Sequence, residues 1–301
     1  MDKDMGTESK SAKSDKFGLK IDIHTHILPT VLDIDKRLQA NEFMGVSKCV
    51  LLSFAKSMPA INGIAPYTPG QACNDARLHP DNFIWFCNVD PRDDGFEKDL
   101  QAYKDQGAQG IGEFASHIPF DCPEMDRLLS LCEEYDLPLL FHMAPDGSPN
   151  YYGVIDDPRL PRLERMLKKH PRAKIIGHSQ PFWFEMADTE EVDSKVRNSF
   201  PIGKIKAKGR VWHLMEEYEN LYCDLSANSG GNAIMRDPEF GLAFLSEFQD
   251  RILWGSDWCG GPFRYGLSAW LDFAMSSKQM DKSVYEKVCR DNAERLFGKR
   301  I

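Results

Sequence analysis

The sequence predicts one α/β domain with the architecture of a (β/α)8 TIM barrel, and three observations lead to this fold class. After Gly18, short apolar runs alternate with stretches of helical spacing, and eight such runs can be counted. Their apolar character is nearly continuous, which is typical of parallel strands that are covered on both faces. The chain has 301 residues, and a complete barrel needs roughly 250.

The eight predicted strands are compact runs rich in Ile, Val, Leu, Phe or Tyr. They are Leu19–Ile27, Lys48–Phe54, Phe83–Val89, Gln109–Phe114, Pro138–Met143, Lys174–His178, Leu221–Leu225 and Ile252–Gly255. Helices are predicted between them from apolar stripes, from acidic first turns and from Gly or Pro at their ends. These helices are Asp93–Gln106, Pro123–Asp136, Pro158–His170, Val211–Tyr218, Pro238–Phe248 and Ser283–Phe297, the last with Ser283 as its N-cap.

Two segments stand outside this alternation. Residues 1–17 are rich in Lys, Ser and Asp and predict a flexible tail, so that the barrel spans 18–301. A long loop at 179–210 follows the sixth strand, which places it on the catalytic face of a barrel.

Composition narrows the functional classes. The net charge of −9 favours solubility and argues against broad nucleic-acid binding, which needs a basic surface. The eight cysteines form no CxxC pair, which indicates reduced thiols and a cytoplasmic protein. No apolar run reaches the roughly 18 residues of a membrane helix. We expect a small-molecule substrate as the partner, no nucleic acid and no membrane, and the sequence leaves a homo-oligomer open.

Imidazoles and carboxylates gather at the predicted strand ends, which meet at one face of a barrel. Two histidines that are two residues apart on one strand point to the same side. Buried charged groups need mutual compensation, and a divalent cation supplies it. The predicted metal ligands are therefore His24, His26, Glu113, His142, His178 and Asp257.

Further residues are candidates for contact with the substrate. Trp183, Trp258 and Tyr67 could form walls of the pocket, although ordinary loop packing explains them equally well. Arg264 follows the eighth strand and could bind a carboxylate of the substrate, and His117 follows Glu113 by four residues at the mouth of the site.

The site motifs as a set resemble the amidohydrolase superfamily. They are closest to its amidohydrolase 2 group of TIM-barrel metal-dependent hydrolases, which includes aminocarboxymuconate semialdehyde decarboxylase. The resemblance spans nearly the whole chain after residue 18. The segments that carry it are Asp22–His26, Phe141–His142, Gly177–Ser179, Leu221–Ser226, Gly255–Trp258 and Asn292–Gly298.

The number of metal ions stays open. The segment Gly110–Phe114 resembles the fourth strand of TatD-like deoxyribonucleases, in which a glutamate bridges two metals. That likeness implies one ion on His24, His26 and Asp257 and a second on His142 and His178, with Glu113 between them. The decarboxylase-like pattern instead implies one ion, held by the two N-terminal histidines, His142 and Asp257, with His178 as an acid, a base or a polarising group.

The resemblance implies a metal-dependent enzyme. Our first expectation is hydrolysis of an amide, ester or lactone in a small carboxylated molecule, with Asp257 carrying protons and His178 polarising the carbonyl. The alternatives are non-oxidative decarboxylation of a small acid and a TatD-like phosphodiesterase. Mixed imidazole and carboxylate ligands suit zinc first, as one or two ions, with manganese and iron also compatible.

Overall fold

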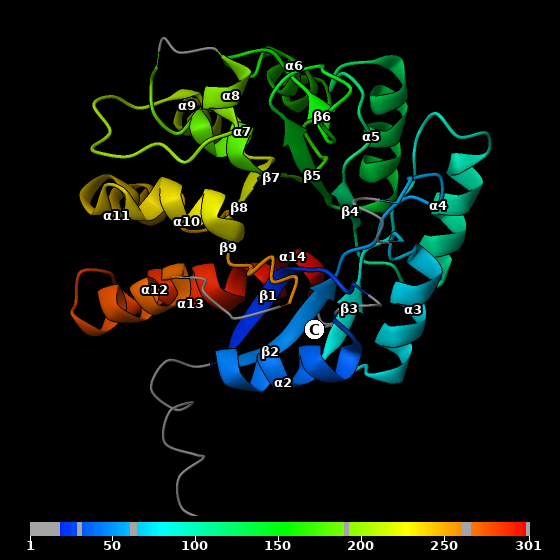
Figure 1. Cartoon of the computed structure of the whole chain (residues 1–301), viewed down its shortest axis with the longest axis horizontal. Coiled ribbons are helices and arrows are strands. Elements are labelled where there is room, and N and C mark those ends of the chain that lie inside the picture. Colours follow the sequence, from blue (N-terminus) through cyan, green and yellow to red (C-terminus); the bar gives the residue numbers. More distant parts are fainter. Residues whose placement is uncertain (1–18, 29–31, 61–64, 190–192, 261–265, 299–301) are drawn as a thin grey trace, which may run out of the picture.

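A closed barrel of eight parallel strands forms the centre of the protein (Figure 1). The structure is a computed structural model that describes residues 19–28, 32–60, 65–189, 193–260 and 266–298. The barrel strands, in spatial order, are β1 (Lys20–Thr25), β2 (Val46–Leu51), β3 (Phe83–Trp85), β4 (Ile111–Phe114), β5 (Leu139–Ala144), β7 (Ile175–His178), β8 (Leu221–Asp224) and β9 (Ile252–Leu253). All eight predicted strands are confirmed, most of them with shorter bounds, while β2 begins two residues earlier and β5 is shifted by one residue.

Two sheets, β1-β2-β3 and β4-β5-β7-β8-β9, join to close the barrel. Between β3 and β4, Cys87 pairs with Ile111 in parallel, and the Gly112 N–H donates to the Cys87 carbonyl at 2.9 Å. Between β9 and β1, the Ile23 N–H donates to the Trp254 carbonyl at 3.2 Å. The first and last strands are therefore neighbours, which brings the two ends of the chain to one site.

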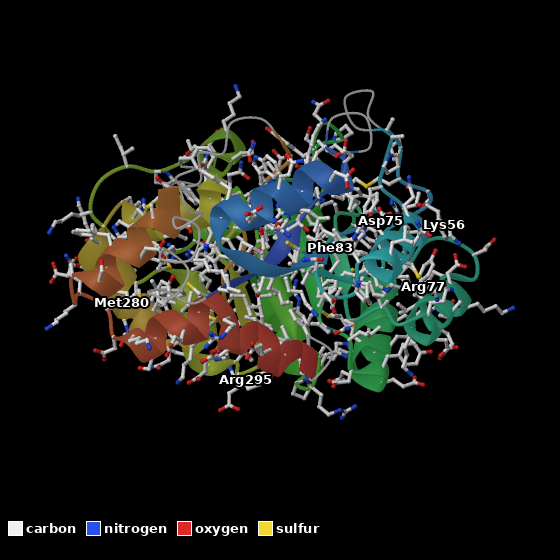
Figure 2. The ribbon with its side chains drawn as sticks, turned by 90° about the horizontal axis from the view of Figure 1, so that it is seen from below. Lys56, Asp75, Arg77, Phe83, Met280 and Arg295 are labelled. Carbon is white, nitrogen blue, oxygen red and sulfur yellow. The ribbon has the colours of Figure 1, made fainter. Side chains whose placement is uncertain are left out.

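Helices surround the barrel; in the view of Figure 2, Arg295 lies near the lower edge of the molecule and Phe83 near its middle, where it packs in the core between strands and helices. The helices on the connections between strands include α2 (Ile34–Met44), α3 (Pro69–Leu78), α4 (Phe96–Asp105), α5 (Pro123–Tyr135), α6 (Pro161–Lys169), α9 (Arg210–Glu217), α10 (Ala227–Met235) and α11 (Pro238–Glu247), and α12 (Gly266–Ser276) follows the last strand, β9. After them come α13 (Lys282–Glu286), a π-helical turn η1 (Lys287–Asp291) and α14 (Asn292–Phe297).

The strands are apolar on both faces because each face packs on its own core. One cluster fills the barrel interior and includes Ile23, Val50, Phe86, Leu140 and Ile176. A larger cluster lies between the strands and the helices. This double burial explains the near-continuous apolar runs from which the barrel was predicted.

The structure corrects the predicted C-terminal helix. Its N-cap is Asp281 rather than Ser283, and η1 interrupts it. The Val288 carbonyl in η1 accepts a hydrogen bond from the Trp254 N–H at 3.0 Å, which ties this helix to the end of β9. The Asn292 side chain adds a hydrogen bond to the Ile252 carbonyl at 2.7 Å.

The loop at 179–210 holds two short helices, α7 (Gln180–Phe184) and α8 (Ser194–Arg197). The structure also adds β6 (Val154–Ile155), which was not predicted and which pairs with β5 beside the barrel. The predicted tail at 1–17 lies outside the described residues. None of the described helices is both long enough and apolar enough to cross a membrane.

Candidate metal centre

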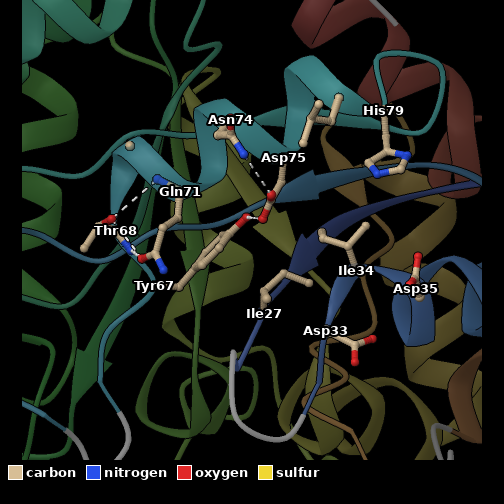
Figure 3. Close-up of a pocket in the computed structure, with 12 residues that line it drawn as sticks. Ile27, Asp33, Ile34, Asp35, Tyr67, Thr68, Gln71, Asn74, Asp75 and His79 are labelled. Atoms are coloured by element: carbon tan, nitrogen blue, oxygen red, sulfur yellow. Dashed lines mark hydrogen bonds between the residues drawn. The ribbon is translucent and has the colours of Figure 1, made fainter.

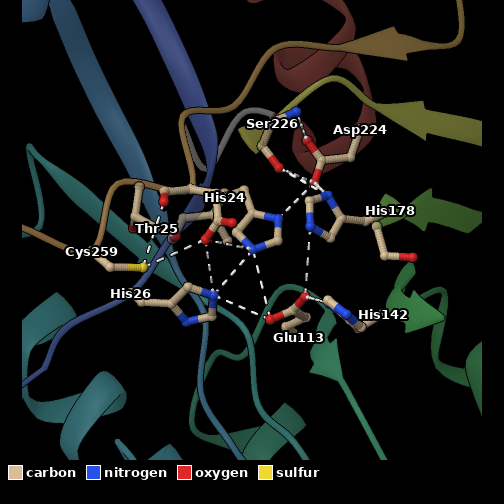
Figure 4. Close-up of polar contacts among 12 residues, drawn as sticks. His24, Thr25, His26, Glu113, His142, His178, Asp224, Ser226 and Cys259 are labelled. Atoms are coloured by element: carbon tan, nitrogen blue, oxygen red, sulfur yellow. Dashed lines mark hydrogen bonds and ion pairs between the residues drawn. The ribbon is translucent and has the colours of Figure 1, made fainter. Parts of the chain in front are cut away.

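Four donor atoms converge at the carboxyl ends of the strands (Figure 4). The Nε2 atoms of His24 and His26 are 3.1 Å apart. Oε2 of Glu113 lies 3.2 Å from Nε2 of His26 and 3.8 Å from that of His24. Oδ1 of Asp257 lies 3.5 Å from Nε2 of His24 and 3.6 Å from that of His26. Ligand atoms around a tetrahedral ion with bonds of about 2.0–2.2 Å stand about 3.3–3.6 Å apart, and the separations from the two imidazoles lie close to this range. His24, His26 and Glu113 could therefore hold one divalent ion, with Asp257 beside them.

The other oxygen of Glu113 faces two further histidines. Oε1 lies 2.7 Å from Nδ1 of His142 and 3.8 Å from Nε2 of His178. These three residues could also hold an ion, because their donor atoms lie within 4.8 Å of one another. The geometry thus offers two clusters that share Glu113. Each contains one pair of donors in hydrogen-bond contact, His24–His26 at 3.1 Å in the first and His142–Glu113 at 2.7 Å in the second.

Asp224, at the end of β8, sits behind the cluster and was not among the predicted site residues. Its Oδ2 lies 2.6 Å from Nδ1 of His24 and 3.1 Å from Nδ1 of His178. The Ser226 hydroxyl donates to the same oxygen at 2.7 Å. A carboxylate on Nδ1 fixes the tautomer of each ring and leaves Nε2 to face the cluster. The sequence carried a signal for Asp224, a carboxylate one residue before the end of the predicted strand Leu221–Leu225 and the last residue of β8.

A second buried network holds the seam between β1 and β9. The Arg37 guanidinium, from α2, donates to Oδ2 of Asp22 at 2.6 Å, and both side chains are fully buried. Asp22 also accepts hydrogen bonds from the backbone N–H groups of His24 at 3.2 Å and of Ser256 at 2.8 Å. The Asp257 N–H in turn donates to the His24 carbonyl at 2.9 Å. The network therefore fixes the backbone that carries His24 and Asp257.

The charges of the cluster call for a cation. Burial disfavours the charged form of His24, but Asp257, Asp224 and Glu113 outweigh it and raise its pKa from 6.5 to about 10. Burial likewise opposes ionisation of Glu113, yet His142, His26 and His24 hold its pKa well below the ordinary value. The pKa of Asp224 is lowered in the same way by His24 and His178. Buried carboxylates among imidazole nitrogens are the donor set of a divalent metal, so the residues present fit such an ion.

A cavity of about 250 Å³ opens onto the cluster. Apolar side chains make much of its wall, and the ring of Phe54 stacks on His26 with centroids 5.3 Å apart. Tyr152 stands opposite, its ring 4.5 Å from that of His142. The residues that line the cavity are His26, Leu28, Phe54, Ala65, Pro66, Tyr67, Glu113, His142, Tyr152, Asp257 and Cys259.

The residues predicted to contact the substrate lie in different parts of the structure. Tyr67 lines this cavity and also a larger outer one of about 710 Å³ between α2 and α3 (Figure 3), where its hydroxyl donates to Asp75 at 2.6 Å. His117 lines a neighbouring cavity. The Trp258 ring packs on the Arg37 guanidinium. Arg264 lies outside the described residues.

Trp183 supports the site from behind instead of lining the described part of the cavity. Its ring is 3% exposed and packs edge-on against Phe182 and Phe244. Its indole N–H donates to the Asp224 carbonyl at 3.0 Å. The hydrogen bond therefore helps to hold the end of β8 in place. The ring lies in the core because it packs on apolar neighbours.

The closed barrel and the buried cluster define the class of TIM-barrel metal-dependent enzymes. The chain belongs to the amidohydrolase family, whose family model matches residues 21–299. No curated protein sequence matches the chain.

Solved structures with the same fold include several decarboxylases. A 2,6-dihydroxybenzoate decarboxylase from Rhizobium is 22% identical with a TM-score of 0.57, and the match covers 93% of this chain and 98% of that one. A 5-carboxyvanillate decarboxylase from Novosphingobium aromaticivorans, with bound manganese, is 16% identical with a TM-score of 0.61, covering 94% and 98%. A probable 2-pyrone-4,6-dicarboxylic acid hydrolase from Acinetobacter baumannii is 15% identical with a TM-score of 0.56, covering 93% and 99%.

Proposed function

We propose that the protein is a metal-dependent decarboxylase that removes the carboxylate of a small aromatic acid as CO2. The observation that carries this proposal is the convergence of four donor atoms, from His24, His26, Glu113 and Asp257, at the base of a largely apolar cavity. Apolar walls suit a ring and hold little water. Decarboxylation needs no water as a reactant, whereas hydrolysis does.

The neighbouring structures support the same choice. Two of the three neighbours described above are decarboxylases of substituted benzoates, and one of these holds manganese. The third is a probable hydrolase, so hydrolysis stays the second candidate. We therefore place decarboxylation ahead of hydrolysis, the reverse of our expectation from the sequence. The mixed nitrogen and oxygen donors suit manganese or zinc.

We assign the principal ion to the four converging donors. His142 and His178 lie at the other oxygen of Glu113, and we assign neither of them as a ligand of this ion. When bound, a divalent ion supplies positive charge that polarises a carboxylate and stabilises negative charge developing on the substrate. Metal analysis of the purified protein should find one ion per chain. Two ions per chain would support the bridging role of Glu113 instead.

The residues of the chain supply orientation and a proton. Asp224 and Ser226 hold the rings of His24 and His178 in place. As CO2 leaves, the carbon–carbon bond breaks and its electron pair stays on the ring carbon, which then takes a proton. Asp257 is placed to deliver this proton, because its side chain is 23% exposed and can exchange protons with solvent.

The two reactions differ in their products, which gives a direct test. Manganese-loaded protein should release one CO2 per turnover from an acid such as 2,6-dihydroxybenzoate or 5-carboxyvanillate, without incorporation of oxygen from labelled water. Ring opening of a pyrone dicarboxylic acid with labelled oxygen in the product, and no CO2 from any benzoate, would support hydrolysis and contradict the proposal.

Replacing Asp224 with asparagine should lower the affinity for the ion by about 10- to 100-fold, because the two imidazoles lose the charged partner that orients them. Titration with a competing chelator measures this affinity. The matched control is Asp126→Asn, which removes a similar carboxylate 2.8 Å from Nε2 of His170 in the outer layer. Equal affinities in both variants would contradict the orienting role.

The affinity for the ion should also rise with pH. In the metal-free protein His24 is protonated up to its pKa of about 10, and an ion can bind only the deprotonated Nε2. Between about pH 7 and 9, binding should therefore release about one proton and strengthen about tenfold per pH unit. Calorimetry in two buffers of different ionisation enthalpy counts that proton. An affinity that does not change with pH would disagree with a raised pKa.

A further inference from the structure

Glu113 is the residue that the two donor clusters share, and its carboxylate is used on both sides (Figure 4). Oε2 lies 3.2 Å from Nε2 of His26, and Oε1 lies 2.7 Å from Nδ1 of His142. A shift of the Glu113 backbone would move both oxygens away from their partners together. Groups that hold this backbone in place therefore bear on the whole metal centre.

The regular β-ladder is irregular at Glu113. The strands β4 and β5 pair in parallel, but their register shifts between Ile111 and Phe114, and Glu113 lies within this stretch. Its side chain is 6% exposed, so water gives the segment little support. Where a buried ladder is irregular, side chains often supply the donors that backbone carbonyls need.

The side chain of Asn88 supplies such a donor. Asn88 follows β3 and is 3% exposed. Its Nδ2 donates to the Glu113 carbonyl at 2.6 Å and to the Ser53 carbonyl at 2.8 Å. Both partners are carbonyls, which can only accept, so the amide must present its nitrogen to them. Both N–H groups of the amide are thus used to join the chain after β2 to β4.

Backbone hydrogen bonds extend this link across three strands. The Ser53 N–H donates to the Gly112 carbonyl at 3.0 Å. The Gly112 N–H donates in turn to the Cys87 carbonyl at 2.9 Å. The carboxyl ends of β2, β3 and β4 are therefore held together, and Asn88 is the side chain that connects them to Glu113.

Asn88 has no place in the wall of the cavity that opens onto the cluster, as far as the described residues define that wall. It lines the neighbouring cavity of about 200 Å³ instead. Its effect on the metal centre therefore passes through the backbone of Glu113 and not through contact with the substrate.

We propose that Asn88 is a positioning residue of the metal centre, which fixes the backbone of Glu113 so that its two carboxylate oxygens stay aimed at their imidazole partners. The inference rests on the proposed function in one respect, since it takes Glu113 as a ligand of the ion. It holds for one ion or for two, because Glu113 belongs to both clusters.

The test compares two buried asparagines that make the same kind of hydrogen bonds. Asn88→Leu keeps the approximate size of the side chain and removes both donors. The matched control is Asn220→Leu, at a residue that is 8% exposed and whose Nδ2 donates to the carbonyls of Leu167 at 3.2 Å and His170 at 2.8 Å. Asn220 precedes β8 and so lies at the amino end of the barrel, whereas the metal cluster lies at the carboxyl ends.

Two measurements on the metal-free full chain separate positioning from stability. Titration with manganese against a competing chelator gives the affinity for the ion, and denaturant unfolding gives the stability. Asn88→Leu should bind manganese about tenfold more weakly than the wild type, because its ligand carboxylate is no longer held in place. Asn220→Leu should lose a comparable amount of stability and keep the wild-type affinity within about twofold.

Cobalt(II) provides a spectroscopic readout, because its visible absorption depends on the number and arrangement of its ligands. The spectrum of cobalt-loaded Asn88→Leu should differ from that of the wild type, and the spectrum of Asn220→Leu should not. Asn88→Ser gives the same test if Asn88→Leu does not fold. It adds no bulk, and its single hydroxyl hydrogen can serve only one of the two carbonyls.

Wild-type affinity and a wild-type cobalt spectrum in the Asn88 variants would overturn this inference. An equal loss of affinity in Asn220→Leu would overturn it as well, since it would assign both asparagines to stability alone. In either case the wild type still binds its ion, so the proposed function would stand. A wild-type chain that binds neither manganese nor cobalt would instead contradict the proposed function itself.

Discussion

Replacing Asp257 with asparagine is expected to lower kcat by about 10²- to 10⁴-fold, because the amide cannot deliver a proton to the reacting carbon. Its Oδ1 lies 3.5 Å from Nε2 of His24, so the amide oxygen of asparagine can keep much of the geometry. At saturating manganese, steady-state kinetics with metal analysis of the same sample separates the loss of turnover from loss of the ion.

The control for this variant is Asp250→Asn. This carboxylate is more than half exposed, and it pairs with Lys287 instead of with a residue of the metal cluster. It should keep full activity and full metal content. Asp257→Asn with unchanged kcat would rule out Asp257 as the proton carrier. Activity that is lost at low manganese and complete at saturating manganese would assign Asp257 as a metal ligand alone.

The second large effect is expected on stability. Arg37→Met should lower the free energy of unfolding by about 3–5 kcal/mol, because it leaves the Asp22 carboxylate buried without its charged partner. Denaturant unfolding of the metal-free protein measures the change.

Two comparisons make the Arg37 result specific. Arg159→Met removes an exposed ion pair with Asp188 and should cost less than about 1 kcal/mol. The double variant Arg37→Met with Asp22→Asn should recover part of the loss, since it also removes the isolated charge. A loss in Arg37→Met no larger than in Arg159→Met would show that the buried pair contributes little.

The barrel could be predicted from the sequence because each strand buries both faces and therefore reads as an apolar run. The helix α2 could not, because it buries Arg37 and Asn41 in place of an apolar stripe. The helix α10 is rich in Gly, Ser and Asn, which are poor helix formers, and it forms through packing on α11 and α7. Tertiary contacts decide these segments, and no apolar stripe marks them, although Asp33 at the N-cap and Gly45 at the C-cap of α2 are local signals of its ends.

The same distinction applies to the site. His24 and Glu113 could be predicted because they lie near the carboxyl ends of predicted strands, and these ends meet at the catalytic face of a barrel. Asp224 ends the strand β8 too, but no second imidazole or carboxylate stands beside it in the sequence as His26 stands beside His24. Tyr152 lies in the irregular link between β5 and β6, where no periodicity in the sequence indicates which way a side chain points. Trp183 could be placed on the catalytic face, but only packing shows that its ring turns into the core.

The seam between β1 and β9 has a consequence for biosynthesis. Asp22 and Ser256, whose hydrogen bonds join that seam, are 234 residues apart in the chain. His24 and His26 are synthesised well before Asp257, so the proposed cluster can form only after β9 has been translated. A folding intermediate that lacks this seam would present the two imidazoles without Asp257. Binding of the proposed ion and closure of the barrel would therefore be coupled.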